Sequence, residues 1–228
     1  EKLAKPVGSL GYDPWGYDKH GIKVGLAAAK WMYDNYFKCE AFGLENIPAH
    51  GRLLVIGNHA GQLPLDGVMV GTAMAFNPHQ PRAARAMIER FFPTVPFLGN
   101  MLNQLGAVIG DPINCIKMLS REEAIIVFPE GVRGSGKPYQ KRYQLQRFGN
   151  GFMHLAMQTN TPIVPVAVVG SEESMPAIAN FKPLAKLLGV PYIPIGALLP
   201  LPVKMTLHFG KPMLFEGDID SEADVMSK

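Results

Sequence analysis

The sequence lacks the features that mark several common classes of protein. No stretch reaches the roughly 18 consecutive apolar residues of a membrane-spanning helix, and no secretory signal peptide is visible. Charged residues make up only 18% of the 228 residues, against 47% that are hydrophobic. These proportions predict a folded chain with a large core and exclude an intrinsically disordered protein. The chain starts at Glu1, and the sequence leaves open whether an anchoring segment precedes it.

Cysteine and net charge are also scarce. Cys39 and Cys115 lie far apart and in no zinc-binding spacing, so we expect two free, buried thiols in place of a disulfide, and no metal site. The net charge of +3 is too small to indicate a nucleic-acid partner, although it suits an anionic membrane surface or an anionic substrate. No Gly-x-Ser-x-Gly motif is present, which disfavours a serine hydrolase.

The order of the apolar segments predicts an α/β fold, with a central, largely parallel mixed sheet flanked by helices. Nearly continuous apolar runs are typical of strands covered on both faces, and they occupy residues 53–56, 84–88, 124–128 and 163–169. Helical patterns lie between them at 112–119 and 148–159, and this alternation favours a parallel sheet. Residues 204–209 alternate polar and apolar side chains, which predicts a strand at an edge or with one wet face.

The sequence divides into an N-terminal segment, 1–45, and a main α/β domain, 46–228. The N-terminal segment contains a predicted helix over Ile22–Phe37 that is apolar nearly all round, with its polar side chains in one narrow stripe. Such a helix packs on the domain or lies against lipid. Two proline-rich loops, 91–98 and 187–203, are also unusually apolar. Either they cover the core or they contact lipid, and finding two of them favours lipid.

A histidine and a carboxylate follow the first predicted strand. The segment Asn58-His59-Ala60-Gly61-Gln62-Leu63-Pro64-Leu65-Asp66 begins two residues after Ile56. A neutral imidazole takes a proton from an alcohol near neutral pH, and a carboxylate on its other nitrogen holds the correct tautomer. Gly61 and Pro64 let the chain turn back, so we expect Asp66 to reach His59. The alternative is a structural histidine in a turn.

A second polar segment follows the third predicted strand. The run Phe128-Pro129-Glu130-Gly131-Val132-Arg133 combines a carboxylate, a glycine and a guanidinium, and Lys137 and Arg142 follow it. Backbone N–H groups at glycines together with basic side chains suit a phosphate-bearing ligand. Residues 131–137 also match the start of a nucleotide-binding P-loop, but Pro138 stands where Ser or Thr should hold Mg²⁺. A nucleotide hydrolase is therefore disfavoured.

Together these segments resemble the lysophospholipid/glycerol-phosphate O-acyltransferase family. That family carries a His-x4-Asp motif and, after a strand, a Phe-Pro-Glu-Gly-x-Arg motif, which residues 128–133 match closely. Residues 161–166 (Thr-Pro-Ile-Val-Pro-Val) resemble its later strand motif. Two features depart from the pattern. Six residues separate His59 from Asp66, so the loop must bulge, and the run 105–112 lacks the family's phosphate-contacting arginine. In lacking this arginine, the sequence resembles the branch of the family near diacylglycerol acyltransferases and phytyl-ester synthases, whose acceptors lack a phosphate.

The resemblance implies transfer of a fatty acyl group from acyl-CoA or acyl carrier protein to the hydroxyl of a lysophospholipid, glycerolipid or other lipid alcohol. His59 would be the general base and Asp66 its orienting acid. Substrate contacts would come from Asn58, Glu130, Gly131, Arg133, Lys137 and Arg142. No metal or redox cofactor is needed. The implied location is the cytoplasmic face of a membrane. A non-catalytic lipid-binding or lipid-transfer protein and an acyl thioesterase remain as alternatives.

Overall fold

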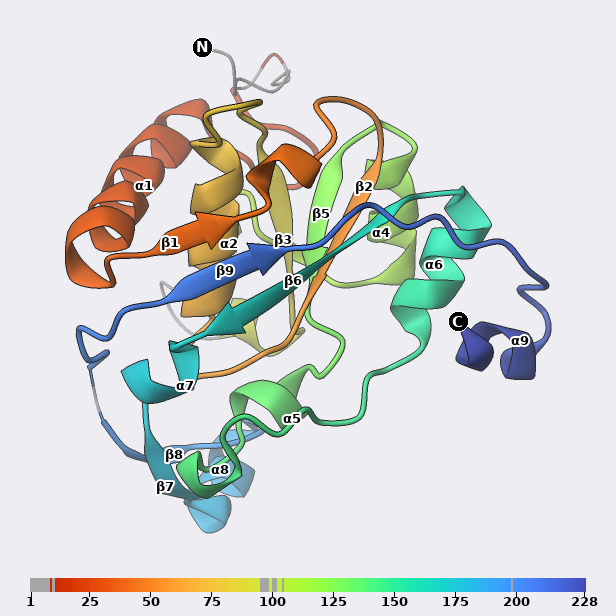
Figure 1. The fold of residues 1–228 in the computed structure, drawn as a ribbon. Helices are drawn as coiled ribbons and strands as arrows, with labels where there is room; N and C mark the ends of the chain where they lie inside the picture. The colour runs from red at the N-terminus through yellow and green to blue at the C-terminus, as the bar shows by residue number, and fades with distance from the viewer. Residues whose placement is uncertain (1–8, 10, 95–98, 100–101, 104, 198) are drawn as a thin grey trace.

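Seven strands form the central sheet, in a computed structural model that describes all residues except 1–8, 10, 95–98, 100–101, 104 and 198 (Figure 1). Across the sheet the order is β1 (Glu40–Phe42), β9 (Thr206–Phe209), β6 (Ile163–Val169), β2 (Leu53–Gly57), β5 (Ala124–Val127), β3 (Ala84–Ile88) and β4 (Val108–Ile109). Every neighbouring pair is parallel except β6 and β9. The predicted α/β class with a largely parallel sheet is confirmed.

Helices cover both faces of this sheet, as the continuous apolar strands predict. On β2, Leu53 and Val55 point into a core formed with α2 (Leu65–Ala75), while Leu54 and Ile56 point into a second core. The second core is closed by α4 (Pro112–Leu119) and α6 (Gly151–Thr159). This alternation follows from the two-residue period of a strand. The resulting layers are visible in Figure 1, with α2 behind the sheet and α4 and α6 at its other side.

The N-terminal segment is built into the domain. Helix α1 (Lys19–Trp31) begins earlier than predicted because the Asp18 carboxylate accepts hydrogen bonds from the N–H groups of His20 and Gly21. It continues into a π-helical turn, η1 (Met32–Tyr36). Strand β1 lies within the segment 1–45, yet it pairs with β9 in the main sheet. Among the helices that the structure describes, none has the length and apolarity to span a bilayer.

At the edges of the domain, the structure confirms some of the sequence-based expectations and departs from others. Strand β9 lies between β1 and β6, so it is not an edge strand, but its burial alternates and one face is wet as predicted. In the apolar stretch 91–98, residues 95–98 lie outside the described part. The stretch 187–203 contains the end of α8 (Lys182–Leu188) and the short strand β8 (Pro194–Gly196), which pairs with β7 (Ala177–Asn180).

Both cysteines are free thiols as expected. Cys115 is buried and Cys39 is half-buried.

The remaining described elements are short. They are η2 (Leu44–Asn46), η3 (Phe92–Thr94), α5 (Val132–Ser135), η4 (Tyr139–Lys141), α7 (Ser171–Ser174) and α9 (Glu222–Ser227). Of these, α5 and η4 matter most for function because they follow the carboxyl end of β5.

The fold makes a prediction about core stability. Leu54 is fully buried in the central strand β2, so Leu54→Ala should lower the free energy of unfolding by about 2–5 kcal/mol through lost burial and a residual cavity. Val24→Ala on the exposed face of α1, where Val24 is 61% exposed, is the control and should change it by less than about 0.5 kcal/mol. Chemical denaturation of both variants measures the difference, and equal effects would contradict the assigned core.

Candidate active site

The candidate site lies where the parallel strands end, the usual ligand-binding edge of an open α/β sheet. His59 stands two residues beyond β2, Glu130 three residues beyond β5, and Glu89 directly after β3. Because β2, β5 and β3 are neighbours in the sheet, their carboxyl ends bring these three side chains to one edge. The two sequence segments that predicted the site therefore meet in space.

The Asp66 carboxylate holds the imidazole of His59. His59 Nδ1 and Asp66 Oδ2 lie 2.6 Å apart, and Asp66 is fully buried. The same oxygen accepts the Ala60 N–H at 3.0 Å, and Oδ1 accepts the Gly67 N–H at 2.7 Å. The six intervening residues turn back through Gly61, which has φ +78° and whose Cα faces the Ser171 carbonyl so closely that a side chain would lie 2.9 Å from it. The expected contact across the longer loop is present.

Two residues of the second segment fix the other sides of His59. The Phe128 ring stacks on the imidazole, with centroids 4.7 Å apart and planes 19° apart. Glu130 is 1% exposed, and its two oxygens accept the backbone N–H groups of His59 at 2.8 Å and Gln146 at 2.6 Å. Glu130 therefore holds the backbone of His59 in place, while Phe128 fixes the plane of the imidazole ring.

These neighbours set the proton affinity of His59. Burial lowers the pKa of the ring, but the charge and hydrogen bond of Asp66 raise it, and the carboxylates of Glu130 and Glu89 raise it further. The net result is a pKa above the ordinary value of 6.5. An imidazole of this kind is a stronger base than a free histidine, and the cost of burying its charged form is offset by Asp66.

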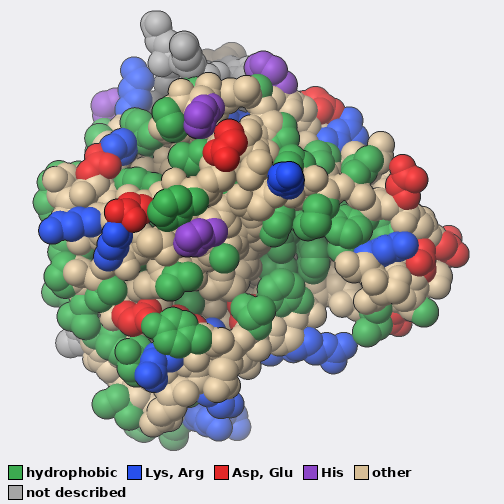
Figure 2. Space-filling view, viewed as in Figure 1, with side chains coloured by type: hydrophobic (Ala, Val, Ile, Leu, Met, Phe, Trp, Pro, Cys, Tyr) green, Lys and Arg blue, Asp and Glu red, His purple; other side chains and the backbone are tan. Residues whose placement is uncertain are grey.

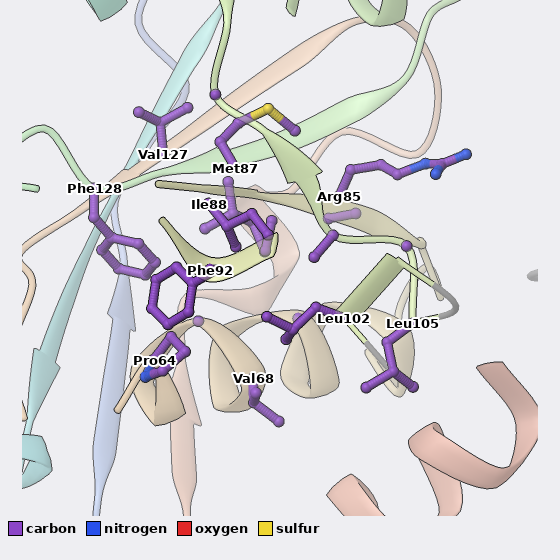
Figure 3. A pocket seen from close by; sticks show the side chains of 18 of the residues that line it. Pro64, Val68, Arg85, Met87, Ile88, Phe92, Leu102, Leu105, Val127 and Phe128 are labelled. Carbon is purple, nitrogen blue, oxygen red and sulfur yellow. The ribbon is translucent and has the colours of Figure 1, made fainter. Parts of the chain in front are cut away.

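An apolar cavity of about 410 Å³ extends from His59 into the domain. Its walls come from α2, β3, the segment around Leu102 and Leu105, and the inner side of α1. Figure 3 shows Phe128, Phe92 and Pro64 together at one end and Leu105 with Arg85 at the other. Because Phe128 stacks on His59, the first of these is the histidine end. The size is that of a small-molecule pocket, and its mainly apolar lining suits an apolar ligand.

A buried cation lines the far end of the cavity. Arg85 is 1% exposed and forms ion pairs with Asp13 and with Glu123, the latter at 3.0 Å. Its guanidinium also lies 4.9 Å from the centre of the Tyr17 ring. Asp13 and Tyr17 belong to the N-terminal segment, so this cluster connects that segment to β3.

Among the other predicted substrate contacts, Gly131 lines the cavity, and the side chains of Asn58 and Lys137 are engaged elsewhere. The Asn58 side-chain amide donates a hydrogen bond to the Val168 carbonyl of β6 at 2.9 Å and accepts one from the Val168 N–H at 2.7 Å. Lys137 is buried against Glu172, with 2.5 Å between Nζ and Oε1. Arg133 is exposed, and Arg142 is exposed and stacks on Tyr139 with 4.6 Å to the ring centre.

Sequence reasoning missed three contributors: the stacking role of Phe128, the carboxylate of Glu89, and the Arg85 cluster. Phe128 was visible in the matched motif, and Glu89 was visible as an acid following a predicted strand. Nothing in the sequence pairs Arg85 with Asp13, because the two are 72 positions apart.

The geometry makes a prediction about titration. Asp66→Asn should lower the pKa of His59, because the carboxylate charge that raises this pKa against the effect of burial is removed. A folded-state pKa above 6.5 means that wild-type His59 stabilises the fold fully below pH 6.5 and loses that contribution as the pH rises through the folded pKa. NMR titration of the His59 ring measures the shift. Glu45→Gln, on the exposed turn η2, is the control, and equal pKa values for all three proteins would refute the coupling.

Comparison with known proteins gives a sequence family and a similar fold. A sequence model of the family described as acyltransferase matches residues 38–169. The 1-acyl-sn-glycerophosphate acyltransferase PlsC of Thermotoga maritima has a similar fold, with a TM-score of 0.57 and 22% identity over 92% of this chain and 73% of that one.

Sequence relatives extend over most of the chain. An uncharacterised protein of Mycobacterium tuberculosis is 35% identical over 96% of this chain, which spans 64% of the relative. A chicken (Gallus gallus) protein named as a DGAT1/2-independent enzyme synthesizing storage lipids is 24% identical over 80% of the chain and 54% of its own length. A chloroplastic 1-acyl-sn-glycerol-3-phosphate acyltransferase of Arabidopsis thaliana is 24% identical over 72% of this chain and 45% of its own length. Because the matched family region covers more than half of its residues, the chain belongs to the acyltransferase family.

Proposed function

We propose that this chain is an O-acyltransferase that moves a fatty acyl group from acyl-CoA, or from an acylated carrier protein, to the hydroxyl of a lipid alcohol. The observation that carries the proposal is the buried His59–Asp66 pair at one end of an apolar cavity of about 410 Å³. The reaction needs a base to deprotonate the hydroxyl, and it needs an apolar channel to hold the fatty acyl group. In this protein the base and the apolar cavity adjoin each other. Membership of the acyltransferase family supports the same chemistry.

The geometry supports a direct transfer. His59 Nε2 accepts the proton of the acceptor hydroxyl as its oxygen attacks the thioester carbonyl carbon. Asp66 stabilises the imidazolium through Nδ1–H, in the manner of the acid in a catalytic triad. The tetrahedral intermediate collapses, the carbon–sulfur bond breaks, and the proton on Nε2 passes to the departing thiolate. The products are an ester and a free thiol, and the step needs no protein nucleophile.

The charges near the histidine favour an acceptor without a phosphate. The Glu89 carboxylate lies so close to Gly131 that a side chain on that glycine would meet its oxygen at 2.7 Å. Both arginines that line the cavity, Arg85 and Arg90, are paired with carboxylates. An anionic headgroup would meet the negative field of Glu89 there. We therefore favour a glycerolipid or other neutral lipid alcohol over a lysophosphatidate.

Other residues take supporting roles in this proposal. Glu130 positions His59, and we assign it no substrate contact because it is buried and each of its oxygens accepts a backbone N–H. Arg133 and Arg142 are exposed beside the site and are candidates to hold phosphates of the acyl donor. We place the reaction at the cytoplasmic face of a membrane, where such thioesters and lipid acceptors meet. The two free thiols suit a reducing compartment.

The central prediction concerns His59. His59→Ala should lower acyl transfer from labelled acyl-CoA to a panel of lipid alcohols by roughly 10²- to 10⁴-fold, the usual worth of a positioned general base. Circular dichroism should show an unchanged fold. His79→Ala, at an exposed loop position, is the matched control and should retain activity. Equal transfer by the wild type and His59→Ala would remove the base assignment.

The same assay separates the alternative functions. A thioesterase would release free fatty acid at a rate independent of the acceptor. A lipid-binding or lipid-transfer protein would retain co-purified lipid and show no turnover. The proposal requires ester formation that depends on both substrates, as measured by mass spectrometry of the lipid products.

The cavity makes a prediction about chain length. Gly71 of α2 lines the cavity, and an added Cβ would meet only Ile126 Cδ1 at 3.8 Å. Gly71→Leu should fill part of the channel and shift donor preference toward shorter acyl chains, while higher helix propensity maintains the fold. Gly71→Ala adds little volume and is the control. A folded Gly71→Leu variant with the wild-type chain-length profile, measured with a series of acyl-CoAs, would exclude this cavity as the acyl site.

A further inference from the structure

One stretch of the chain is strongly basic. Residues 131–215 contain nine Lys or Arg and only two acidic residues, Glu172 and Glu173, whereas acidic residues outnumber basic ones in the rest of the sequence. Lys137 pairs with Glu172 and Lys204 pairs with Glu40, and most of the other basic side chains of this stretch form no ion pair with the residues that the structure describes. A net charge of +3 for the whole chain hides this asymmetry.

Much of this stretch gathers at one end of the molecule. Strand β7, helix α8 and strand β8 form a projection at the lower end of Figure 1, beside α5. The projection is tied to the site loops: the Asn180 side chain donates to the Gly136 carbonyl at 2.6 Å, and the Tyr192 hydroxyl donates to the Gln62 carbonyl at 3.0 Å. Gln62 lies between His59 and Asp66, so the projection is attached directly to the catalytic loop.

The outside of this projection is apolar and basic. Of the residues of α8, only Ala185 is buried, while Leu187 is 80% and Leu188 61% exposed. We call the exposed set the α8 surface; it comprises Ile178, Phe181, Lys182, Lys186, Leu187, Leu188, Ile195 and Leu199. Within the described part of the chain, neither Lys182 nor Lys186 forms an ion pair. Figure 2 shows green and blue side chains together at this lower end.

We propose that the α8 surface is a docking site for an anionic lipid bilayer. Exposed leucines next to unpaired lysines are the pattern of interfacial membrane-binding segments, in which apolar side chains enter the headgroup region and lysines attract anionic lipids. The absence of acidic side chains from residues 174–215 gives the charge complementarity that such a surface requires. Six exposed large apolar side chains on one small projection are uncommon on a protein that has no partner there.

Docking by this surface would set the orientation of the enzyme. Because Tyr192 holds the loop that carries His59 and Asp66, the active-site edge of the sheet would stay close to the lipid headgroups. The inference deepens the membrane association proposed above. Vesicle binding is measured without any catalytic turnover. Failure to bind vesicles would therefore count against the α8 surface alone, and failure to transfer acyl groups would count against the proposed function alone.

Vesicle flotation with the full chain tests the proposal. Wild-type protein should bind vesicles of phosphatidylcholine with added phosphatidylglycerol, and bind vesicles of phosphatidylcholine alone much less. Each lysine near an anionic surface is worth roughly fivefold in partitioning, so the double variant Lys182→Gln/Lys186→Gln should lose about 25-fold. Leu187→Ser/Leu188→Ser should also lose binding, and added salt should weaken it.

Matched substitutions on α4 provide the control. Lys117→Gln/Ile113→Ser alters an exposed lysine and a side chain that is 63% exposed, at a distance from α8 (Figure 1), and should bind as the wild type does. All variants should keep the wild-type circular dichroism spectrum. Equal losses for the α4 and α8 variants would overturn the assignment. So would wild-type protein that ignores anionic vesicles but binds an acidic acyl carrier protein through the same lysines.

Discussion

The buried carboxylate of Asp66 is the interaction on which the candidate site depends. It accepts hydrogen bonds from the His59 ring and from the backbone N–H groups of Ala60 and Gly67. One side chain therefore joins the loop after β2 to the first turn of α2 and orients the imidazole at the same time. A fully buried carboxylate is tolerated only because these donors satisfy it, so the local fold and the tautomer of His59 depend on each other.

A second constraint is the space beside that histidine. Small side chains on the wall, among them Gly67 and Gly71 of α2 and Ala84 and Ala86 of β3, leave an apolar cavity where larger residues would fill the core. At the inner end the Arg85 cluster holds residues of the N-terminal segment in place. The described residues of the segment 1–45 are thus part of the architecture, because they supply β1 and one wall of the cavity.

The main strands and the His59–Asp66 contact could be predicted from the sequence. Strands β2, β5 and β6 are apolar on both faces, β3 is apolar except for Arg85, and a turn-prone loop links His59 to Asp66. Helix α2 was not predicted, because it is apolar nearly all round and carries two glycines, so it lacks a helical period. The pairing of Lys137 with Glu172 and the backbone bonds of Glu130 depend on contacts between distant segments. A sequence shows that such groups are present without showing what they bind.

The most direct test of the account is a double-mutant cycle for acyl transfer with His59→Ala, Asp66→Ala and the combined variant. If the carboxylate acts through the imidazole, the combined variant should be no slower than His59→Ala alone, because Asp66 has nothing left to orient. Independent, multiplicative losses from the two substitutions would show that Asp66 acts separately, and would contradict a base held and tuned by its buried acid.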